Sequence, residues 1–208
     1  MLRTTCPNIS IITNFGCRSN CWYCIWKGHR LENVKIDTDW KKLYDFLLFY
    51  HSKGKVSVSG GGDCLYKFDK YKFWWESFFN ITEKLHMLVD IHTREKFTAG
   101  SFWEKINRCV FSSDRLENDI DYLRCLSKLT KIRITHLVTK ETTNEMIQDY
   151  LIFKKEINCQ FTIKELVGHD DGGRYKKIKE KYPDIIYLDA GDYNIYYMPD
   201  NSTTDTFL

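Results

Sequence analysis

Three cysteines stand close together near the start of the chain, at Cys17, Cys21 and Cys24, in a C-x₃-C-x₂-C pattern. Cysteine thiolates are the usual protein ligands of iron–sulfur clusters. Three of them on one short loop can bind three corners of a metal cluster and leave the fourth corner without a protein ligand. Catalytic metal centres keep such an open position, whereas structural sites are closed. The pattern therefore predicts a metal centre that does chemistry.

A zinc site is the other interpretation of these cysteines. Zinc needs a fourth ligand, and His29 follows Cys24 closely enough to serve. Structural zinc sites usually combine two C-x₂-C-like pairs, and no second pair is present. The other cysteines are isolated, and two of them, Cys109 and Cys125, lie in apolar stretches where a free cysteine usually behaves as a small hydrophobic residue. We expect none of these isolated cysteines to be a ligand.

The composition is that of a core-forming protein with a mild positive charge. The chain has 208 residues, 43% of them hydrophobic, and a formal net charge of +3. This charge permits an anionic substrate but does not indicate nucleic acid. No stretch approaches the length of a membrane span, and the first residues lack the apolar region of a signal peptide. We therefore expect a cytoplasmic protein with no membrane partner, whereas the sequence does not indicate the oligomeric state.

Strand-like and helix-like segments alternate along most of the chain. Six such units predict a parallel sheet, and because a closed (β/α)₈ barrel needs eight, we expect an open, partial (β/α)₆ barrel. Two more β-like runs predict a terminal hairpin or edge strand, so residues 1–200 form one domain with a short C-terminal β extension and residues 201–208 a polar tail. We expect strands at 9–14, 55–59, 86–93, 108–113, 131–139 and 160–166, helices at 37–52, 68–85, 102–107, 116–129 and 143–157, and the β-like runs at 185–188 and 193–198.

A run of glycines, Gly60, Gly61 and Gly62, precedes Asp63 directly after the second expected strand. The cysteine loop follows the first strand in the same way. Because binding sites of parallel α/β sheets lie at the C-terminal ends of the strands, we expect both motifs on one rim. Glycines let the backbone take positive φ and approach a ligand closely, so the carbonyl groups of this turn can accept hydrogen bonds from an ammonium group.

The cysteine spacing, directly after a first strand in a chain of six βα units, resembles that of the radical S-adenosylmethionine (SAM) superfamily. The resemblance implies a [4Fe–4S] cluster on the three cysteines, with SAM as the ligand of the open iron. Tyr23 occupies the aromatic position of that family whose backbone lies beside the adenine of SAM. The glycine turn stands where the family has a Gly-Gly-Glu-like turn for the SAM amino group, with Asp63 in place of the commoner Glu.

Further candidate residues lie at later strand ends. Ser112 and Ser113 end the fourth strand, and the resemblance makes them candidates for the ribose or carboxylate of SAM. His92 and Arg94 share one face of the third strand and are candidates for substrate binding. Asp90 lies on the same face, and the alternative interpretation is two solvent-exposed residues together with one buried histidine that has a backbone partner. Lys164, on the sixth strand, could hold an anionic substrate or the SAM carboxylate, although a surface lysine is the default interpretation.

The resemblance implies a reaction as well. An electron from the reduced cluster cleaves SAM to methionine and a 5′-deoxyadenosyl radical, which abstracts hydrogen from a substrate. The enzyme class implied is an oxidoreductase or a lyase. The electron donor would be a protein such as flavodoxin or ferredoxin. The short chain with one cysteine cluster favours a compact member acting on a small polar or nucleotide-like molecule.

Three alternatives remain open. The first is a glycyl-radical-enzyme activase that acts on a partner protein. The second resembles 7-carboxy-7-deazaguanine synthase, but that family has Thr or Ser after the third cysteine, where Ile25 stands here. The third is a non-catalytic iron–sulfur or zinc module that mediates interactions.

Overall fold

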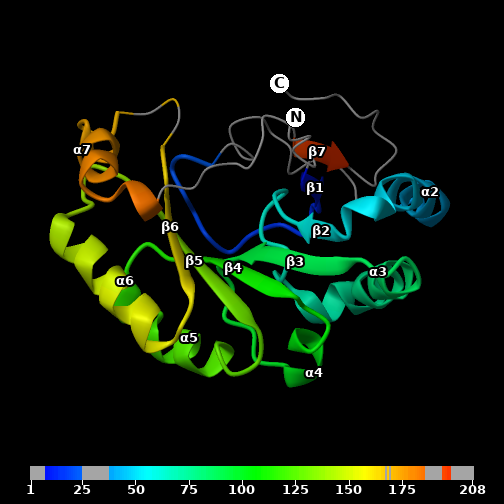
Figure 1. Cartoon of the computed structure of the whole chain (residues 1–208). Helices are drawn as coiled ribbons and strands as arrows, with labels where there is room; N and C mark the ends of the chain where they lie inside the picture. The colour runs from blue at the N-terminus through cyan, green and yellow to red at the C-terminus, as the bar shows by residue number, and fades with distance from the viewer. Residues whose placement is uncertain (1–7, 25–37, 167, 169, 186–193, 198–208) are drawn as a thin grey trace, which may run out of the picture.

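A single curved sheet of parallel strands organises the molecule (Figure 1). The computed structural model describes residues 8–24, 38–166, 168, 170–185 and 194–197. The strand order is β6-β5-β4-β3-β2-β1-β7, so the sheet is open, and the expected partial (β/α)₆ barrel is confirmed. The strands are Asn8–Ile11 (β1), Lys55–Val58 (β2), Leu88–Thr93 (β3), Arg108–Ser112 (β4), Lys131–Leu137 (β5), Gln160–Lys164 (β6) and Asn194–Tyr197 (β7).

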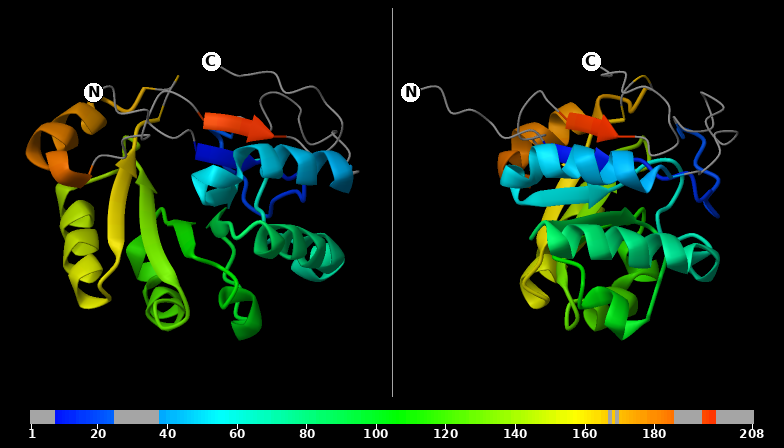
Figure 2. Two further views of the ribbon diagram at one scale, coloured as in Figure 1. Left: turned by 45° about the vertical axis from the view of Figure 1, so that its right-hand side comes forward. Right: turned by 90° about the vertical axis from the view of Figure 1, so that its right-hand side faces the viewer.

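The helices lie outside the curve of the sheet (Figure 2). Helix α3 buries the aromatic side chains of Trp74, Trp75, Phe78 and Phe79, whereas Phe73 is exposed. The α-helices are Trp40–Tyr50 (α2), Lys72–Lys84 (α3), Gly100–Trp103 (α4), Ile120–Leu126 (α5), Asn144–Glu156 (α6) and Arg174–Lys181 (α7). Short 3₁₀ turns are His51–Lys53 (η2), Phe68–Tyr71 (η3), Leu116–Asn118 (η4) and Pro183–Ile185 (η5).

The two faces of the sheet differ sharply in polarity. The convex face, under the helices, carries buried aliphatic residues such as Ile11, Val58 and Ile91. The concave face is polar, because successive strand residues point to opposite sides. The register places one row of polar residues side by side across β1 to β5, formed by Ser10, Ser57, Asp90, Arg108 and Lys131. The concave face is therefore suited to polar ligands, and the core lies on the other side.

Several element boundaries differ from those expected. Helix α2 begins at Trp40, and its N-cap is Asp39, whose carboxylate accepts a hydrogen bond from the Lys42 N–H at 3.0 Å. Thr38, just before this cap, accepts from the Trp74 indole at 2.9 Å, and Asp37, where the expected helix began, lies outside the described residues. Strand β1 ends at Ile11, so residues 12–14 are free to turn toward the cysteine loop.

The second β-like run of the C-terminal region is an edge strand. β7 pairs with β1 in parallel, with Ile9 opposite Ile195, which confirms an edge strand in place of a hairpin. Of the first run, Ile185 ends the 3₁₀ turn η5, and the rest lies outside the described residues, as does the expected polar tail. Within the described ranges, no helix has the length and apolar character that crossing a membrane requires.

Candidate functional site

The cysteine loop and the glycine turn lie side by side at the C-terminal ends of β1 and β2. Gly16 and Gly62 form an isolated parallel bridge, and the Asp63 N–H donates to the Gly16 carbonyl at 2.7 Å. Cys17, the first cysteine of the motif, follows this bridge directly. All three motif cysteines are free and half-buried. The two motifs thus meet on one rim, as their positions after neighbouring strands predict.

The glycine turn is required by the approach of the protein's own backbone. Gly60, Gly61 and Gly62 all have positive φ, at 71°, 64° and 98°. A Cβ atom on Gly61 would stand 1.3 Å from the Thr13 carbonyl oxygen, and one on Gly62 would stand 2.1 Å from that of Gly16. The sequence suggested close approach to a ligand, but the side of the turn that excludes a side chain faces the segment leading into the cysteine loop. Ligand binding by the turn's carbonyl groups stays a prediction.

Asp63 connects the glycine turn to the end of β3. Its buried carboxylate accepts from the Thr93 hydroxyl at 2.6 Å, from the Leu65 N–H at 2.9 Å and from the Arg94 N–H at 2.6 Å. Both carboxylate oxygens therefore have protein donors. Any contact of Asp63 with a cofactor falls to its backbone, while its side chain fixes the position of Arg94.

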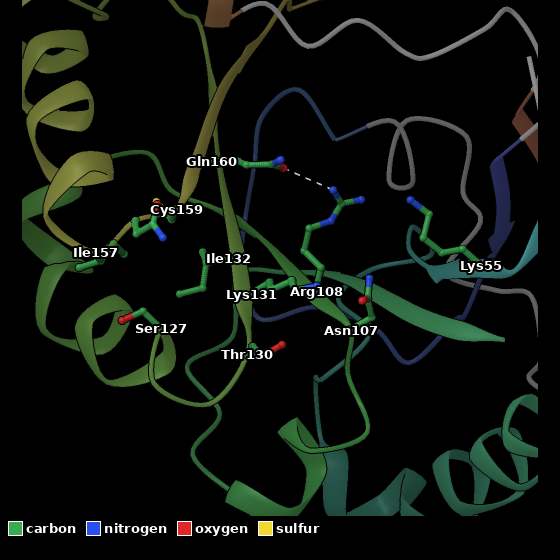
Figure 3. A pocket seen from close by; sticks show the side chains of 11 residues that line it. Lys55, Asn107, Arg108, Ser127, Thr130, Lys131, Ile132, Ile157, Cys159 and Gln160 are labelled. Carbon is green, nitrogen blue, oxygen red and sulfur yellow. Dashed lines mark hydrogen bonds between the residues drawn. The ribbon is translucent and has the colours of Figure 1, made fainter. Parts of the chain in front are cut away.

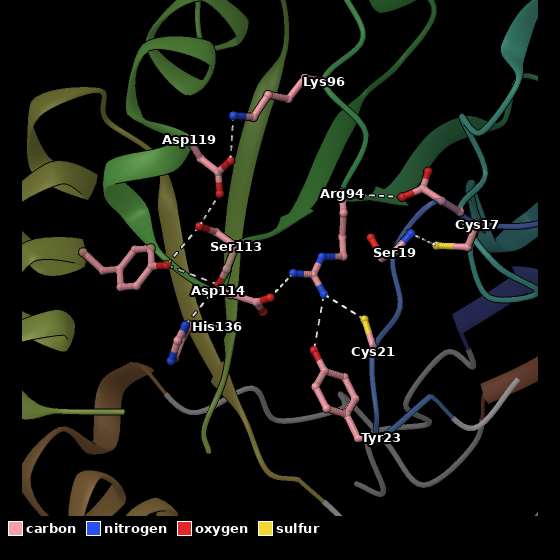
Figure 4. A network of polar contacts seen from close by, with 12 residues as sticks. Cys17, Ser19, Cys21, Tyr23, Arg94, Lys96, Ser113, Asp114, Asp119 and His136 are labelled. Carbon is pink, nitrogen blue, oxygen red and sulfur yellow. Dashed lines mark hydrogen bonds and ion pairs between the residues drawn. The ribbon is translucent and has the colours of Figure 1, made fainter. Parts of the chain in front are cut away.

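Arg94 reaches from the end of β3 to the cysteine loop (Figure 4). Its Nη1 lies 3.1 Å from the Cys21 sulfur and 3.3 Å from the Tyr23 hydroxyl, while Nη2 forms an ion pair with Asp114. Substrate binding by Arg94 stays a prediction, and in the structure its side chain contacts the cysteine loop. A second contact has the same effect, because Arg18 forms an ion pair with Glu95 at 3.2 Å.

Asp114 and Glu95 were missed by the sequence reasoning. Each follows a strand of the sheet within a few residues, β4 for Asp114 and β3 for Glu95. A search of every charged residue just beyond a strand end would have found both.

Burial raises the pKa of two groups of the cysteine loop, Tyr23 and Cys17. Burial, reinforced by the negative charge of Asp114, raises the pKa of Tyr23 to about 12, so its hydroxyl group remains a hydrogen-bond donor. Burial also raises the pKa of the Cys17 thiol, although the Ser19 N–H lies 3.3 Å from its sulfur and acts in the opposite direction.

The donor set of this rim, three thiols on one loop, has the chemistry of iron–sulfur cluster ligands. Among the described residues, no three Cys, His, Asp or Glu side chains converge on one ion. A single zinc ion would require its ligands to lie within about 2.3 Å of one point. In a [4Fe–4S] cluster each cysteine binds its own iron, so the sulfurs stay apart. Three thiols on one half-buried loop match that arrangement, while His29, the alternative zinc ligand, lies outside the described residues.

The two serines at the end of β4 point to opposite faces. Ser112 lies on the concave face, in register with Thr135 of β5, and is partly exposed. Ser113 is 1% exposed; its hydroxyl donates to Asp119 at 2.7 Å and accepts from Tyr150 at 2.9 Å. Only Ser112 is therefore placed to meet a ligand on the concave face.

His92 and Lys164 also face the concave side. His92 lies opposite Val110 of β4, and Lys164 opposite Leu137 near the C-terminal end of the sheet. Burial lowers the pKa of His92 to about 3, and the positive charge of Lys164 adds to this effect. His92 is therefore neutral at physiological pH. A second histidine, His136, is buried between the Ser113 carbonyl and the Thr142 hydroxyl.

The isolated cysteines divide into buried and exposed positions. Cys64 and Cys109 are fully buried, and burial raises the pKa of each thiol. Cys125, which the sequence places in an apolar stretch, is exposed on α5. The apolar neighbours of Cys125 in the sequence, Leu123 and Leu126, occupy the buried side of that short helix.

Comparison with known proteins shows a likeness of fold. No family model matches the chain, and no curated protein matches it. Among solved structures, the chain is similar to native anSMEcpe with bound AdoMet and Kp18Cys peptide, with a TM-score of 0.53 and 14% sequence identity. The match covers 77% of this chain and 52% of that one, so this chain spans about half the length of that protein. The likeness shows a radical SAM-like fold.

Proposed function

We propose that this chain is a radical SAM enzyme. The observation that carries the proposal is the cysteine loop of Cys17, Cys21 and Cys24, held against a glycine turn at the C-terminal rim of an open parallel barrel. The three cysteines would bind three irons of a [4Fe–4S] cluster, and SAM would bind the fourth. The likeness of fold to an AdoMet-bound structure supports this assignment.

The rim residues supply binding and orientation. The carbonyl groups of Gly60 and Gly61 would accept from the SAM amino group, and Ser112 would donate to its ribose or carboxylate. The backbone of Tyr23 would lie beside the adenine, while Arg94 fixes the side chains of Tyr23 and Cys21 from the other side. When bound, the reduced cluster supplies the electron that cleaves SAM to methionine and a 5′-deoxyadenosyl radical able to abstract hydrogen from the substrate.

The substrate we favour is a small polar or nucleotide-like molecule on the concave face below the rim. Hydroxyl groups from neighbouring strands gather there, with Thr135 and Thr162 3.2 Å apart. His92 adds a neutral imidazole, which can donate or accept a hydrogen bond. The concave face therefore offers polar contacts to a ligand and stays open around it.

A peptide segment of a partner protein is a second candidate substrate, as in a glycyl-radical-enzyme activase. The similar solved structure holds a peptide as well as AdoMet, and the sheet of this chain is likewise open. Deuterium transfer to 5′-deoxyadenosine from labelled metabolite mixtures or from labelled protein would distinguish the two substrate classes.

Anaerobic reconstitution with iron and sulfide tests the proposal. We expect about four irons per chain and release of 5′-deoxyadenosine from SAM after reduction with dithionite. The Cys24→Ala variant should lose the iron and its visible absorption, whereas Cys125→Ala, which removes an exposed thiol on α5, should keep both. Equal iron content in the two variants, or a single zinc with no SAM cleavage, would overturn the proposal.

A further inference from the structure

Two arginines on the concave face, well below the rim, meet at one neutral oxygen. Figure 3 shows one of the two contacts, that of Arg108 with Gln160. Arg133 of β5 donates from Nε to the Gln160 side-chain oxygen at 2.9 Å, and Arg108 of β4 donates from Nη1 to the same atom at 3.4 Å. The Gln160 oxygen thus stands where an oxygen of an anion would stand between two guanidinium groups. Arginine pairs of this kind match the geometry of carboxylates and phosphates.

The local charge is unbalanced in the positive direction. The nearest acidic partner is Asp90, which is 2% exposed and accepts from Arg108 Nη2 at 2.5 Å and from the Asn107 amide at 2.7 Å. Lys55 lies 3.5 Å from the same carboxylate. Among the contacts of the described residues, Asp90 thus meets two cationic side chains, Lys55 and Arg108, and Arg133 adds a third positive charge through the shared Gln160 oxygen. Like charges held together in a partly desolvated site favour the arrival of an anion.

Arg108 also has a donor without a partner. Its Nε is buried, and no acceptor for it exists in the described part of the chain. A buried N–H group that lacks an acceptor is costly, and such groups in folded proteins call for an explanation. A bound oxyanion offers several acceptor oxygens beside this guanidinium, so the group is better satisfied with a ligand than without one.

A cavity of about 640 Å³ opens at this end of the concave face (Figure 3). The described residues that line it include Lys55, Arg108, Lys131 and Gln160, and none of those residues is acidic. The volume lies within the range of small-molecule sites. His92 lies in the same row of the sheet as Arg133 and Gln160. Burial is the main cause of its lowered pKa, and the positive charges of Lys164, Arg108 and Arg133 lower it further, as a positive region requires.

We infer that Arg108 and Arg133 form a binding site for an oxyanion, the phosphate or carboxylate group of a small molecule. Ser112 at the rim lies four positions beyond Arg108 along β4, a distance of roughly 13 Å. A molecule anchored by its anionic group at this site would extend along the concave face toward the cysteine loop. That the molecule is the substrate rests on the proposed function, whereas the anion site does not.

Calorimetric titration of the chain, without cluster or SAM and in phosphate-free buffer, tests the inference. The probes are inorganic phosphate, ribose 5-phosphate and succinate. We expect at least one to bind, and Arg133→Gln to weaken that binding about tenfold or more, because it removes a charged hydrogen-bond donor. The exposed Lys131→Gln provides a second variant that leaves the packing untouched, with an expected loss of about threefold from charge alone.

The matched control is Arg124→Gln, which removes the same charge from the surface of α5 on the convex side, where Arg124 pairs with Glu156 at 2.6 Å. Affinities that are equal in Arg133→Gln, Lys131→Gln and Arg124→Gln would overturn the site, as would the absence of binding by all three probes. The ranking of the probes distinguishes a free ion, a phosphorylated molecule and a carboxylate. Anion binding without SAM cleavage would support the anion site and contradict the proposed function. SAM cleavage without anion binding would support the proposed function and overturn the anion site.

Discussion

The rim of the sheet and the concave face below it are held together by different forces. At the rim, backbone meets backbone: Gly62 bridges Gly16, and Gly61 leaves no room for a side chain against Thr13. Below it, charged side chains from separate strands meet one another, as Arg108 does with Asp90 and Gln160.

This difference predicts which kind of substitution destabilises each region. The rim should be sensitive to volume, because a close backbone contact cannot yield without moving a strand. The concave face should tolerate changes of volume and respond to changes of charge and pH. The three variants that follow test this division, beginning with the largest expected effect.

The substitution Gly61→Ala should disrupt the rim. The added Cβ would overlap the Thr13 carbonyl oxygen at 1.3 Å, and alanine disfavours the φ of 64° at this position. We expect the free energy of unfolding to fall by about 3 kcal/mol or more, since strain and overlap act together. Urea denaturation measures the change.

The control for this experiment is Gly100→Ala at the start of α4, where a Cβ atom would meet nothing within 4 Å. We expect that variant to be unchanged or more stable by up to about 1 kcal/mol, because alanine favours helix. Similar losses in the two glycine variants would show that the rim is not sensitive to volume.

The substitution His92→Gln should flatten the pH dependence of stability. The folded protein keeps His92 neutral, with a pKa of about 3, while the unfolded chain binds a proton near pH 6.5. The stabilisation is complete above pH 6.5 and is lost progressively as the pH falls toward 3. Between pH 6.5 and 5 the wild type should lose about 2 kcal/mol more than the variant.

Unfolding in urea at a series of pH values measures that difference. The charged groups that act on His92 are Lys164, Arg108, Arg133 and Asp90. Parallel pH profiles for wild type and variant would show that the charges on the concave face do not act on His92.

The substitution Arg94→Gln should have the smallest effect on stability, below about 1 kcal/mol, because its ion pair with Asp114 is partly exposed. Its effect should appear in local order, since Arg94 joins the Cys21 sulfur and the Tyr23 hydroxyl to the end of β3. Hydrogen–deuterium exchange of residues 17–24 should become faster.

Lys96→Gln is the matched variant, because Lys96 extends from the same loop to Asp119 at 3.1 Å and away from the cysteines (Figure 4). Exchange of residues 17–24 should be the same in this variant as in wild type. If both variants accelerate exchange equally, the side chain of Arg94 does not hold the cysteine loop.

The sequence predicted well those features that depend on neighbours along the chain. The spacing of the three cysteines lies within eight residues, and the alternation of strands and helices depends on local hydrophobic patterns. Both led to the open parallel barrel that the structure has. The bounds were less accurate where a cap or a turn decides them, as with Asp39 at the start of α2.

Other predictions depended on contacts that a local pattern cannot supply. Ser112 and Ser113 were equal candidates, because strand alternation places them on opposite faces without saying which face meets a ligand. Arg94 was assigned to substrate because it shares a strand face with His92. In the structure it turns to Cys21, which lies 73 residues away in the sequence.

By itself, then, the sequence determined that three thiols share one loop after a strand and that glycines fill a turn after the next strand. Only the tertiary structure decided that these glycines face Thr13 and Gly16, that Asp63 fixes Arg94, and that two arginines converge on Gln160. The reason is physical. Residue type and spacing limit what a segment can do, but its partners are set by the strand order and register of the folded sheet.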